Sequence, residues 1–299
     1  MSRTNIAMGV DIGGTHITAA LIDWQNKAII PSTLSRVSVN AAGTTDEIIH
    51  AWSSCMMATK LYTEVDSICF AMPGPFDYNA GISLMRGQDK FENMYQQNIK
   101  DLLAQSLNLP RHIFFMDNDA ACFLQGEVFK GAVSLHDQNT VIGITLGTGL
   151  GSAVYKEGKS KSADRWCWPF KGGIAEDYLC TRWFVKRWHE LTGETISGVR
   201  QLTGLPSTNE HIKTIFSEFG EHLAAFLLDF IATESPEAVV IGGNIAKAFE
   251  RFSPTVTTII NETYPSIEIK AATLGEEAPL LGAVSSWLHS KNHFSFISN

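Results

Sequence analysis

The sequence has few cysteines, and their spacing forms no recognisable pairs. The 299 residues contain five cysteines, and no two of them have the CxxC spacing of zinc knuckles. An odd, scattered set also argues against a disulfide framework. We therefore predict reduced thiols in a cytoplasmic protein and no zinc site. The five residues are Cys55, Cys69, Cys122, Cys167 and Cys180.

Long apolar runs and an excess of positive charge are also missing. Apolar stretches such as AVVIGG at residues 238–243 are much shorter than the roughly 20 residues of a membrane span. A strand pattern begins by about Ile6, so we expect no signal peptide. The net charge of −8 argues against nucleic acid as a partner, although backbone amides can hold an anionic ligand without lysine. We predict neither a membrane nor a nucleic-acid partner.

Strand and helix patterns alternate along the chain, which predicts an α/β fold. An apolar fraction of 44% is typical of a soluble enzyme, and 299 residues suit one large domain or two lobes. At residue 140 the opening pattern of strand, glycine turn and strand returns, which suggests two lobes descended from one unit. The other expected elements are a hairpin at 6–23, helices at 44–59, 98–110, 119–129, 211–236 and 276–290, strands at 67–77 and 112–116, a strand, Gly-Gly and helix at 237–252, and an open loop at 193–210.

The first glycine turn, Gly13 and Gly14, joins two predicted strands. A Walker loop joins a strand to a helix and needs a lysine, so this turn is not one. Its amides can point into one concavity, where the missing side chains let phosphate oxygens approach. Asp11 could hold Mg²⁺ through water, and Thr15 could donate its hydroxyl. The alternative is an ordinary hairpin with a convenient Gly-Gly.

Two further glycine turns strengthen the phosphate interpretation. Gly147, Thr148, Gly149 and Gly151 form the second. Gly242 and Gly243 form the third, before a helix, where a nucleotide could lie against bare backbone. One such turn is common, but three in one chain favour a nucleotide-binding function.

The stretch MDNDAA places Asp117, Asn118 and Asp119 where a strand ends and a helix begins. The alternative explanation is simple, because Asp and Asn are favoured helix N-caps. A carboxylate beside a phosphate site can accept the proton of a substrate hydroxyl. The helix dipole lowers the pKa of such a carboxylate and makes it a weaker base. In a loose transition state, however, the orientation of the base matters more than its basicity. We predict that Asp119 is the general base.

The motifs DIGGTH, PGPFD, DNDAACFLQGE, LGTGLGSA and VVIGGNI occur in this order, and the ordered set resembles the ROK family of sugar kinases from residue 6 to about residue 288. The family belongs to the actin-like ATPase clan. The resemblance implies a two-lobed actin-like ATPase (ribonuclease H-like) fold with mixed β-sheets, and ATP and a sugar in an interlobe cleft. It implies a smaller lobe at 1–117 joined by a C-terminal helix at 285–299, a larger lobe at 118–284, and favours a homodimer.

The resemblance also assigns roles to single residues. It implies ATP and Mg²⁺, with Asp11 near the metal and the turns 13–15 and 147–149 on the phosphates. Asp119 matches the catalytic base. The adenosine would lie by Gly242, Gly243 and Asn244. The sugar would be held by Asn118, Asp119, Glu176 and the backbone of Gly74 in the PGPFD loop.

The segment at 162–179 departs from the family. It is shorter and lacks the Glu-x-Gly-His and Cys-x-Cys-Gly motifs, so no zinc is predicted and no histidine matches the family's sugar contact. Trp166 and Trp168 either stack on a sugar or pack in place of the zinc loop, and we favour packing. Asn93, in the position of a family sugar loop, is a candidate contact, although a solvated role is favoured. His16 is expected to point away from Thr15, with no functional role.

The leading functional hypothesis is ATP-dependent phosphorylation of a hexose hydroxyl, glucokinase-like, with O6 of glucose or a related sugar as the expected acceptor. A kinase for an N-acetylated or amino sugar is an alternative, because the 162–179 segment differs. A sugar-responsive transcriptional regulator and an actin-like ATPase without kinase activity are less favoured alternatives.

Overall fold

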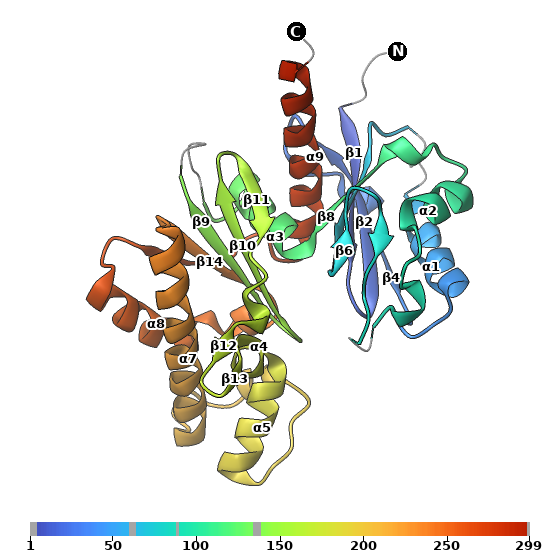
Figure 1. Ribbon diagram of the computed structural model, residues 1–299. Helices are drawn as coiled ribbons and strands as arrows, with labels where there is room; N and C mark the ends of the chain where they lie inside the picture. Colours follow the sequence, from blue (N-terminus) through green and yellow to red (C-terminus); the bar gives the residue numbers. More distant parts are fainter. Residues whose placement is uncertain (1–4, 60–63, 88–89, 134–138, 298–299) are drawn as a thin grey trace. The chain divides into compact units, whose positions relative to one another are not determined.

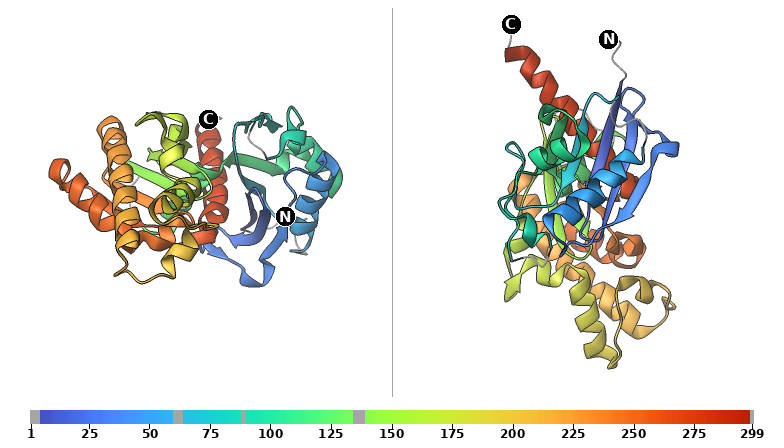
Figure 2. Two further views of the ribbon diagram at one scale, coloured as in Figure 1. Left: turned by 90° about the horizontal axis from the view of Figure 1, so that it is seen from below. Right: turned by 90° about the vertical axis from the view of Figure 1, so that its right-hand side faces the viewer.

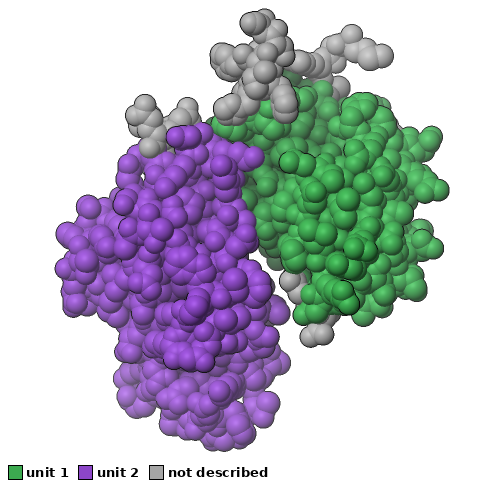
Figure 3. Space-filling model, in the orientation of Figure 1, with its two compact units in different colours: residues 1–134, 276–299 green, residues 135–275 purple. Residues whose placement is uncertain are grey.

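The computed structural model describes residues 5–59, 64–87, 90–133 and 139–297. The chain divides into two compact units: unit 1 contains residues 1–134 and 276–299, and unit 2 contains residues 135–275 (Figure 3). These boundaries differ from the predicted ones at 117/118 and 284/285. No helix within the described ranges is both long and apolar enough to cross a membrane.

Unit 1 is built on a mixed sheet of order β3-β2-β1-β5-β8, with β4 also paired to β2 (Figure 1). The predicted hairpin is confirmed as antiparallel β1 and β2, while β5 and β8 run parallel to β1. The carboxyl ends of β1, β5 and β8 therefore reach the same edge of the sheet. The bounds are β1 Ile6–Ile12, β2 His16–Asp23, β3 Ala28–Ile29, β4 Ser35–Ser38, β5 Ile68–Met72 and β8 Phe114–Asn118.

Helices α1 (Thr45–Met57) and α2 (Ile99–Leu107) bury an apolar stripe in the core of unit 1, around Trp52 and Leu103. A capping box fixes the start of α1, in which Thr44 Oγ1 accepts from the Glu47 amide. The short strands β6 (Phe76–Asp77), at the end of the PGPFD motif, and β7 (Ile82–Ser83) form an antiparallel pair. The remaining short turns are η1 Pro31–Thr33, η2 Glu92–Met94 and η3 Arg111–Ile113.

Helices α3 (Asp119–Phe129) and α9 (Ala278–Ile297) pack backbone against backbone in unit 1 (Figures 1 and 2). A Cβ added at Gly282 would lie 1.7 Å from the Cys122 carbonyl oxygen, and one added at Gly126 would lie 2.0 Å from that of Ala278. A Cβ at Gly9 of β1 would similarly meet the Leu280 carbonyl oxygen at 2.5 Å. This tight packing is why α3 and all of α9 belong with the first sheet, contrary to the predicted boundaries.

Unit 2 repeats the pattern with a sheet of order β11-β10-β9-β14-β15. Here β9 and β10 form the antiparallel hairpin, and β14 and β15 run parallel to β9. The repeat predicted from the sequence is therefore present in the pairing of the strands. The bounds are β9 Val141–Leu146, β10 Leu150–Lys156, β11 Lys159–Ser162, β14 Ala238–Gly242 and β15 Glu268–Ala271.

The core of unit 2 is rich in aromatic residues from α5 (Thr181–Thr192), α7 (Glu210–Glu234) and α8 (Phe249–Thr263). The expected open loop at 193–210 contains a short helix, α6 (Val199–Thr203), because the apolar Val199 and Leu202 are buried in this core. The remaining short elements are η4 Arg165–Cys167, β12 Pro169–Phe170, β13 Gly173–Ile174, α4 Ala175–Tyr178, η5 Ile245–Ala248 and η6 Gly275–Glu277.

Candidate active site

The carboxyl edge of the unit 1 sheet gathers most of the polar residues predicted for this unit. Asp11 of β1 lies opposite Ala71 of β5, which lies opposite Asp117 of β8. Parallel strands end at the same edge, so the segments that follow β1, β5 and β8 meet there. The 13–15 turn and Gly74 lie in the segments after β1 and β5, while Asn118 ends β8 and Asp119 follows it.

Negative charge is concentrated around Asp11. The pKa of its carboxyl is raised to about 7, mainly by burial and further by Asp119 and Glu276, while Arg36 opposes the shift. Arg36 and Glu276 form an ion pair. The described residues contain no cluster of three or more His, Cys, Asp or Glu side chains suited to a metal. A carboxylate of this kind fits Mg²⁺ that takes its other ligands from water and substrate phosphates.

The neighbouring Asn118 and Asp119 have different tasks at the start of α3. Asn118 is the N-cap, and its Oδ1 accepts from the Ala121 amide at 3.1 Å. The capping alternative therefore explains Asn118 but not Asp119. Asp119 is the first helical residue and partly exposed, and its Oδ1 accepts from the Ala120 amide at 2.8 Å.

Tyr78 belongs to this edge of the sheet, and the sequence reasoning missed it. Its hydroxyl accepts from Asn118 Nδ2 at 3.1 Å and donates to the Met72 carbonyl at 3.3 Å. A Cβ added at Gly74 would lie 3.1 Å from the same hydroxyl. Burial raises the pKa of Tyr78, so its hydroxyl stays protonated. The available signal was an aromatic residue directly after the PGPFD motif.

The first glycine turn is closed by a hydrogen bond from the Gly13 amide to the His16 carbonyl at 2.9 Å. Gly14 and Thr15 are exposed. Thr15 Oγ1 lies 2.9 Å from His16 Nδ1, so the expectation that these side chains point apart was wrong. The physical reason is that β2 begins only at His16, and Thr15 still belongs to the turn.

In unit 2, the 147–149 turn and the 242–244 segment lie at the same edge of the second sheet. Gly242 of β14 is opposite Thr145 of β9, just before the turn. The Gly147 amide donates to the Gly149 carbonyl at 3.0 Å. The Gly147 carbonyl accepts from the amide and the hydroxyl of Thr181 at 2.8 and 2.9 Å. The N-terminus of α5 is thereby fixed to the turn.

The fold requires glycine at some of the predicted positions and not at others. Gly243 has a φ of +87°, and an added Cβ would meet the Leu146 carbonyl oxygen at 2.4 Å. At Gly149 a Cβ would lie 2.6 Å from Glu176 Oε2. At Gly147 it would meet nothing within 4 Å, and at Gly14 only the flexible Lys90 at 3.9 Å. The last two positions have space for a side chain, which is consistent with a ligand approaching the backbone there.

Glu176, expected at the sugar, contacts the second glycine turn. Its Oε2 accepts from the Leu150 amide at 3.0 Å, and its Oε1 accepts from Arg182 Nη2 at 3.1 Å. It is the second residue of the short helix α4, and two residues separate this helix from α5. The carboxylate therefore links the 147–150 backbone to a cation on α5.

A cavity of about 440 Å³ opens beside Thr148. Its volume is within the range of small-ligand pockets. Apart from Thr148, the sequence reasoning named none of its residues, and the available signal was the pair of cations four positions apart on α5. The lining residues are Thr148, Thr181, Arg182, Val185, Lys186 and Ser197.

The remaining candidates lie elsewhere or serve the fold. Asn93 Nδ2 donates to the Gly43 carbonyl at 2.9 Å and holds that loop. The ring of Trp168 covers the buried Arg165 guanidinium at 3.5 Å, and Trp166 is 40% exposed. Asn244 is exposed, and the structure gives it no side-chain cap of the following turn η5.

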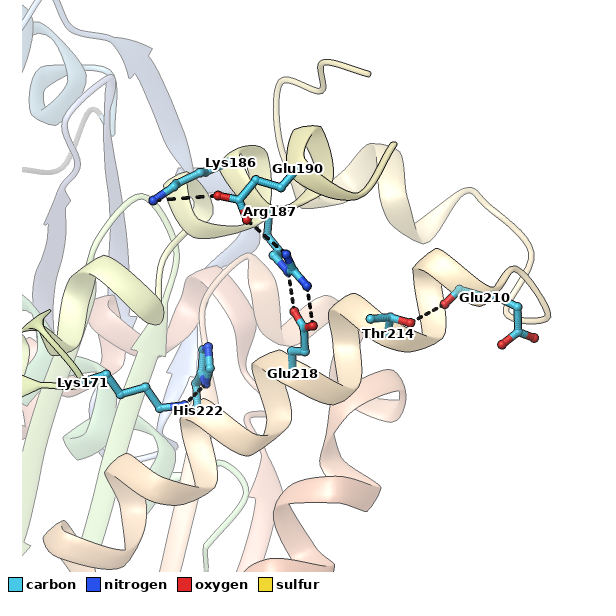
Figure 4. Close-up of polar contacts among 8 residues, drawn as sticks. All are labelled: Lys171, Lys186, Arg187, Glu190, Glu210, Thr214, Glu218 and His222. Atoms are coloured by element: carbon cyan, nitrogen blue, oxygen red, sulfur yellow. Dashed lines mark hydrogen bonds and ion pairs between the residues drawn. The ribbon is translucent and has the colours of Figure 1, made fainter. Parts of the chain in front are cut away.

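Aromatic packing occupies the segment that differs from the family pattern. The rings of Phe170, Tyr178 and Trp183 lie 5.3–6.4 Å from that of His222 on α7. Lys171 Nζ lies 2.7 Å from His222 Nδ1, which couples the β12–β13 hairpin to α7 (Figure 4). The pKa of His222 is lowered to about 4, first by burial and then by Lys171, so the imidazole is neutral and can accept this hydrogen bond.

Known proteins with related sequences include both enzymes and regulators. A glucokinase of Thermotoga maritima is 25% identical over 320 residues, covering 93% of this chain and 96% of the relative. A beta-glucoside kinase of Listeria monocytogenes is 25% identical over 305 residues, covering 94% and 97%. The xylose repressor of Bacillus subtilis is 20% identical over 95% of this chain and 77% of its own length.

The solved structure of a ROK family glucokinase from Streptomyces griseus, in complex with glucose and AMPPNP, has a TM-score of 0.75 to this chain. The two are 23% identical, and the match covers 93% of this chain and 97% of the other. This likeness confirms the predicted actin-like ATPase fold with mixed sheets. The profile described as the ROK family matches residues 7–165 and 166–290, nearly the whole sequence. The chain therefore belongs to the ROK family.

Proposed function

We propose that this protein transfers the γ-phosphoryl group of ATP to a hexose hydroxyl, with O6 of glucose as the expected acceptor and Asp119 as the general base. The general activity does not depend on the roles of single residues: the chain is an ATP-dependent sugar kinase of the ROK family. The observation that carries the finer proposal is the position of Asp119, partly exposed at the sheet edge that also holds Asp11 and the 13–15 turn.

In this mechanism Asn118 and the Gly74 backbone orient the sugar. Asn118 Nδ2 has a second hydrogen besides the one donated to Tyr78, and this hydrogen is offered to a sugar hydroxyl. Glu176 is the expected acceptor for another hydroxyl. Asp119 accepts the proton of the attacking hydroxyl as its oxygen bonds to the γ-phosphorus and the bond from that phosphorus to the leaving ADP breaks.

The phosphates are held by backbone amides rather than by a Walker lysine. The open positions at Gly14 and Gly147 let phosphate oxygens approach, with Thr15 and Thr148 as hydroxyl donors. The segment 242–244 is proposed to bind the adenosine. Mg²⁺, when bound near Asp11, supplies positive charge that neutralises the phosphate oxygens.

The direct test is Asp119→Asn, which keeps the size of the side chain but removes the base. We expect kcat to fall by roughly 100- to 10,000-fold with ATP binding retained, the range of a lost general base. Asp101→Asn is the matched control, because Asp101 is also an acid in the first turn of a unit 1 helix and is exposed. Unchanged turnover of Asp119→Asn would refute the assignment.

The sugar is identified by coupled ADP release across a panel of hexoses, N-acetylated sugars and amino sugars, with and without magnesium. Preference for an amino or N-acetylated sugar would correct the expected acceptor. ATP hydrolysis indifferent to every sugar would favour a non-kinase ATPase, and sugar-dependent DNA binding without turnover would favour a regulator. The magnesium requirement, a homodimer and a cytoplasmic location stay predictions.

A further inference from the structure

The cavity beside Thr148 in unit 2 has an unusual charge composition. Three of its lining residues carry hydroxyls, two are cations, and one, Val185, is apolar. None is a carboxylate. A wall of hydroxyls and cations next to a backbone turn suits an anion with several oxygens better than a neutral ring.

The end of α5 adds to this preference. Its first residue, Thr181, lines the cavity and is hydrogen bonded to the carbonyl of Gly147. A helix of 12 residues presents partial positive charge at its N-terminus. The dipole, Arg182 and Lys186 thus act in the same direction.

Three neighbouring cations on α5 differ in how far they are already neutralised. Arg187 holds Glu218 with two bonds of 2.6 Å and Glu190 with one of 3.1 Å, and Figure 4 shows it reaching α7. Lys186 lies 3.9 Å from Glu190 and its side chain is 80% exposed. Arg182 is 67% exposed, with Glu176 as its carboxylate partner. Arg182 and Lys186 are therefore the cations that can take a ligand.

A second cavity, of about 470 Å³, borders the same two side chains but has a different character. Asp177 and Glu190 line it, as does the saturated Arg187. These carboxylates oppose an anion there. An anionic ligand is consequently expected on the side of Thr148 and not on the side of Asp177.

We propose that Arg182 and Lys186 bind the phosphate chain of the donor nucleotide in the cavity beside Thr148, and that Glu176 orients Arg182. This inference rests on the proposed kinase function and adds side-chain cations to the backbone amides of the 147–149 turn. Glu176 is then a positioning residue for the donor in addition to its expected contact with the sugar.

The test measures equilibrium binding of ATP, ADP, AMP and adenosine by calorimetry, without sugar. Lys186→Met and Arg182→Met are each expected to weaken ATP binding about tenfold, as loss of one charge-assisted contact implies. The loss should shrink from ATP to AMP and vanish for adenosine. Lys213→Met is the matched control, because Lys213 is also an exposed lysine paired with a glutamate on a unit 2 helix.

Glu176 is tested by a double-mutant cycle. Glu176→Gln should weaken ATP binding in the wild-type background and add little in the Arg182→Met background, because it acts through Arg182. A purely structural loss would add in both backgrounds. Arg182→Lys, which keeps the charge, should recover part of the affinity.

Either unchanged ATP affinity in both single variants or an equal loss for adenosine and ATP would overturn the inference. Tighter binding of free phosphate or glucose 6-phosphate than of ATP would also overturn it, because the site would then take another anion. If wild-type protein shows no sugar-dependent ADP release, the proposed function fails instead, and the binding data still report on the cavity.

Discussion

The two units share the order and pairing of five strands but differ in the charge of the side chains at the carboxyl edge of the sheet. In unit 1 the strand before the turn carries Asp11, and in unit 2 the equivalent position, also two residues before the first glycine, is Thr145. The acids Asp119 and Glu276 act on Asp11 before the first turn, and hydroxyls with two cations line the cavity beside the second turn. The repeated scaffold therefore supplies two backbone turns, while the segments packed around each turn decide which charge it meets.

This difference suggests that the two units bind different parts of the reactants. The acidic edge of unit 1 suits a cation and an alcohol that must lose a proton. The cationic edge of unit 2 suits the oxygens of a phosphate chain. If the interpretation is correct, equivalent substitutions in the two units must have unequal effects.

The largest inequality is expected at the paired positions before the turns. Asp11→Asn should lower kcat by roughly 100-fold or more, because it weakens the proposed hold on Mg²⁺, whose charge would stabilise the reacting phosphates. Thr145→Val should lower it less than about fivefold, since Thr145 has no proposed role. Steady-state ADP release on both variants checks this. Similar losses in the two units would contradict this interpretation.

A second inequality concerns stability at different pH values. The pKa of Asp11 is raised from 3.8 to about 7 in the folded protein. Its contribution to the free energy of unfolding is therefore full below pH 3.8 and is lost as the pH rises through about 7. Asp11→Asn should therefore stabilise the protein at pH 8, by about 2 kcal/mol, and little at pH 4. Urea unfolding at both pH values measures this. An Asn variant less stable than wild type at pH 8 would show that the carboxylate is not strained by burial.

The contribution of His222 in unit 2 to stability should depend on pH in the opposite sense. The folded pKa of His222 is lowered from 6.5 to about 4, so its contribution is present above pH 6.5 and is lost as the pH falls through about 4. Lys171, Arg187 and Glu218 are the charged groups that act on it. His222→Gln should flatten this dependence between pH 4 and 6.5, by about 1–2 kcal/mol. Unfolding monitored at several pH values in that window distinguishes a flattened slope from a uniform loss of packing.

Local patterns in the sequence predicted the elements but not the contacts between distant ones. The hairpins, the acids at strand ends and the order of the motifs were readable because they depend on neighbouring residues. Tyr78 was missed because its partner Asn118 is 40 positions away. The lobe boundaries were misplaced because Gly126 and Gly282 look like ordinary helix glycines until α3 and α9 are packed together. Arg182 and Lys186 became candidates only when the cavity beside them was known.

The smallest expected effect is a difference in stability between two glycine variants. One glycine is required by the fold, and the other leaves space for a ligand. Gly147→Ala should change the free energy of unfolding by less than about 1 kcal/mol, because its φ is not left-handed and its Cβ meets nothing. Gly243→Ala should cost about 1–2 kcal/mol or more, since its φ is +87°.

Gly147→Ala should have a clear effect on ATP binding although it hardly changes stability. At Gly147 the added methyl occupies the space through which phosphate oxygens would reach the amides, so we expect about tenfold weaker binding of ATP. Adenosine should bind Gly147→Ala as it binds the wild type, because it has no phosphates to meet the methyl group. If ATP binds equally well to Gly147→Ala and the wild type, the second turn is only a hairpin, and the cations of α5 must hold the donor without it.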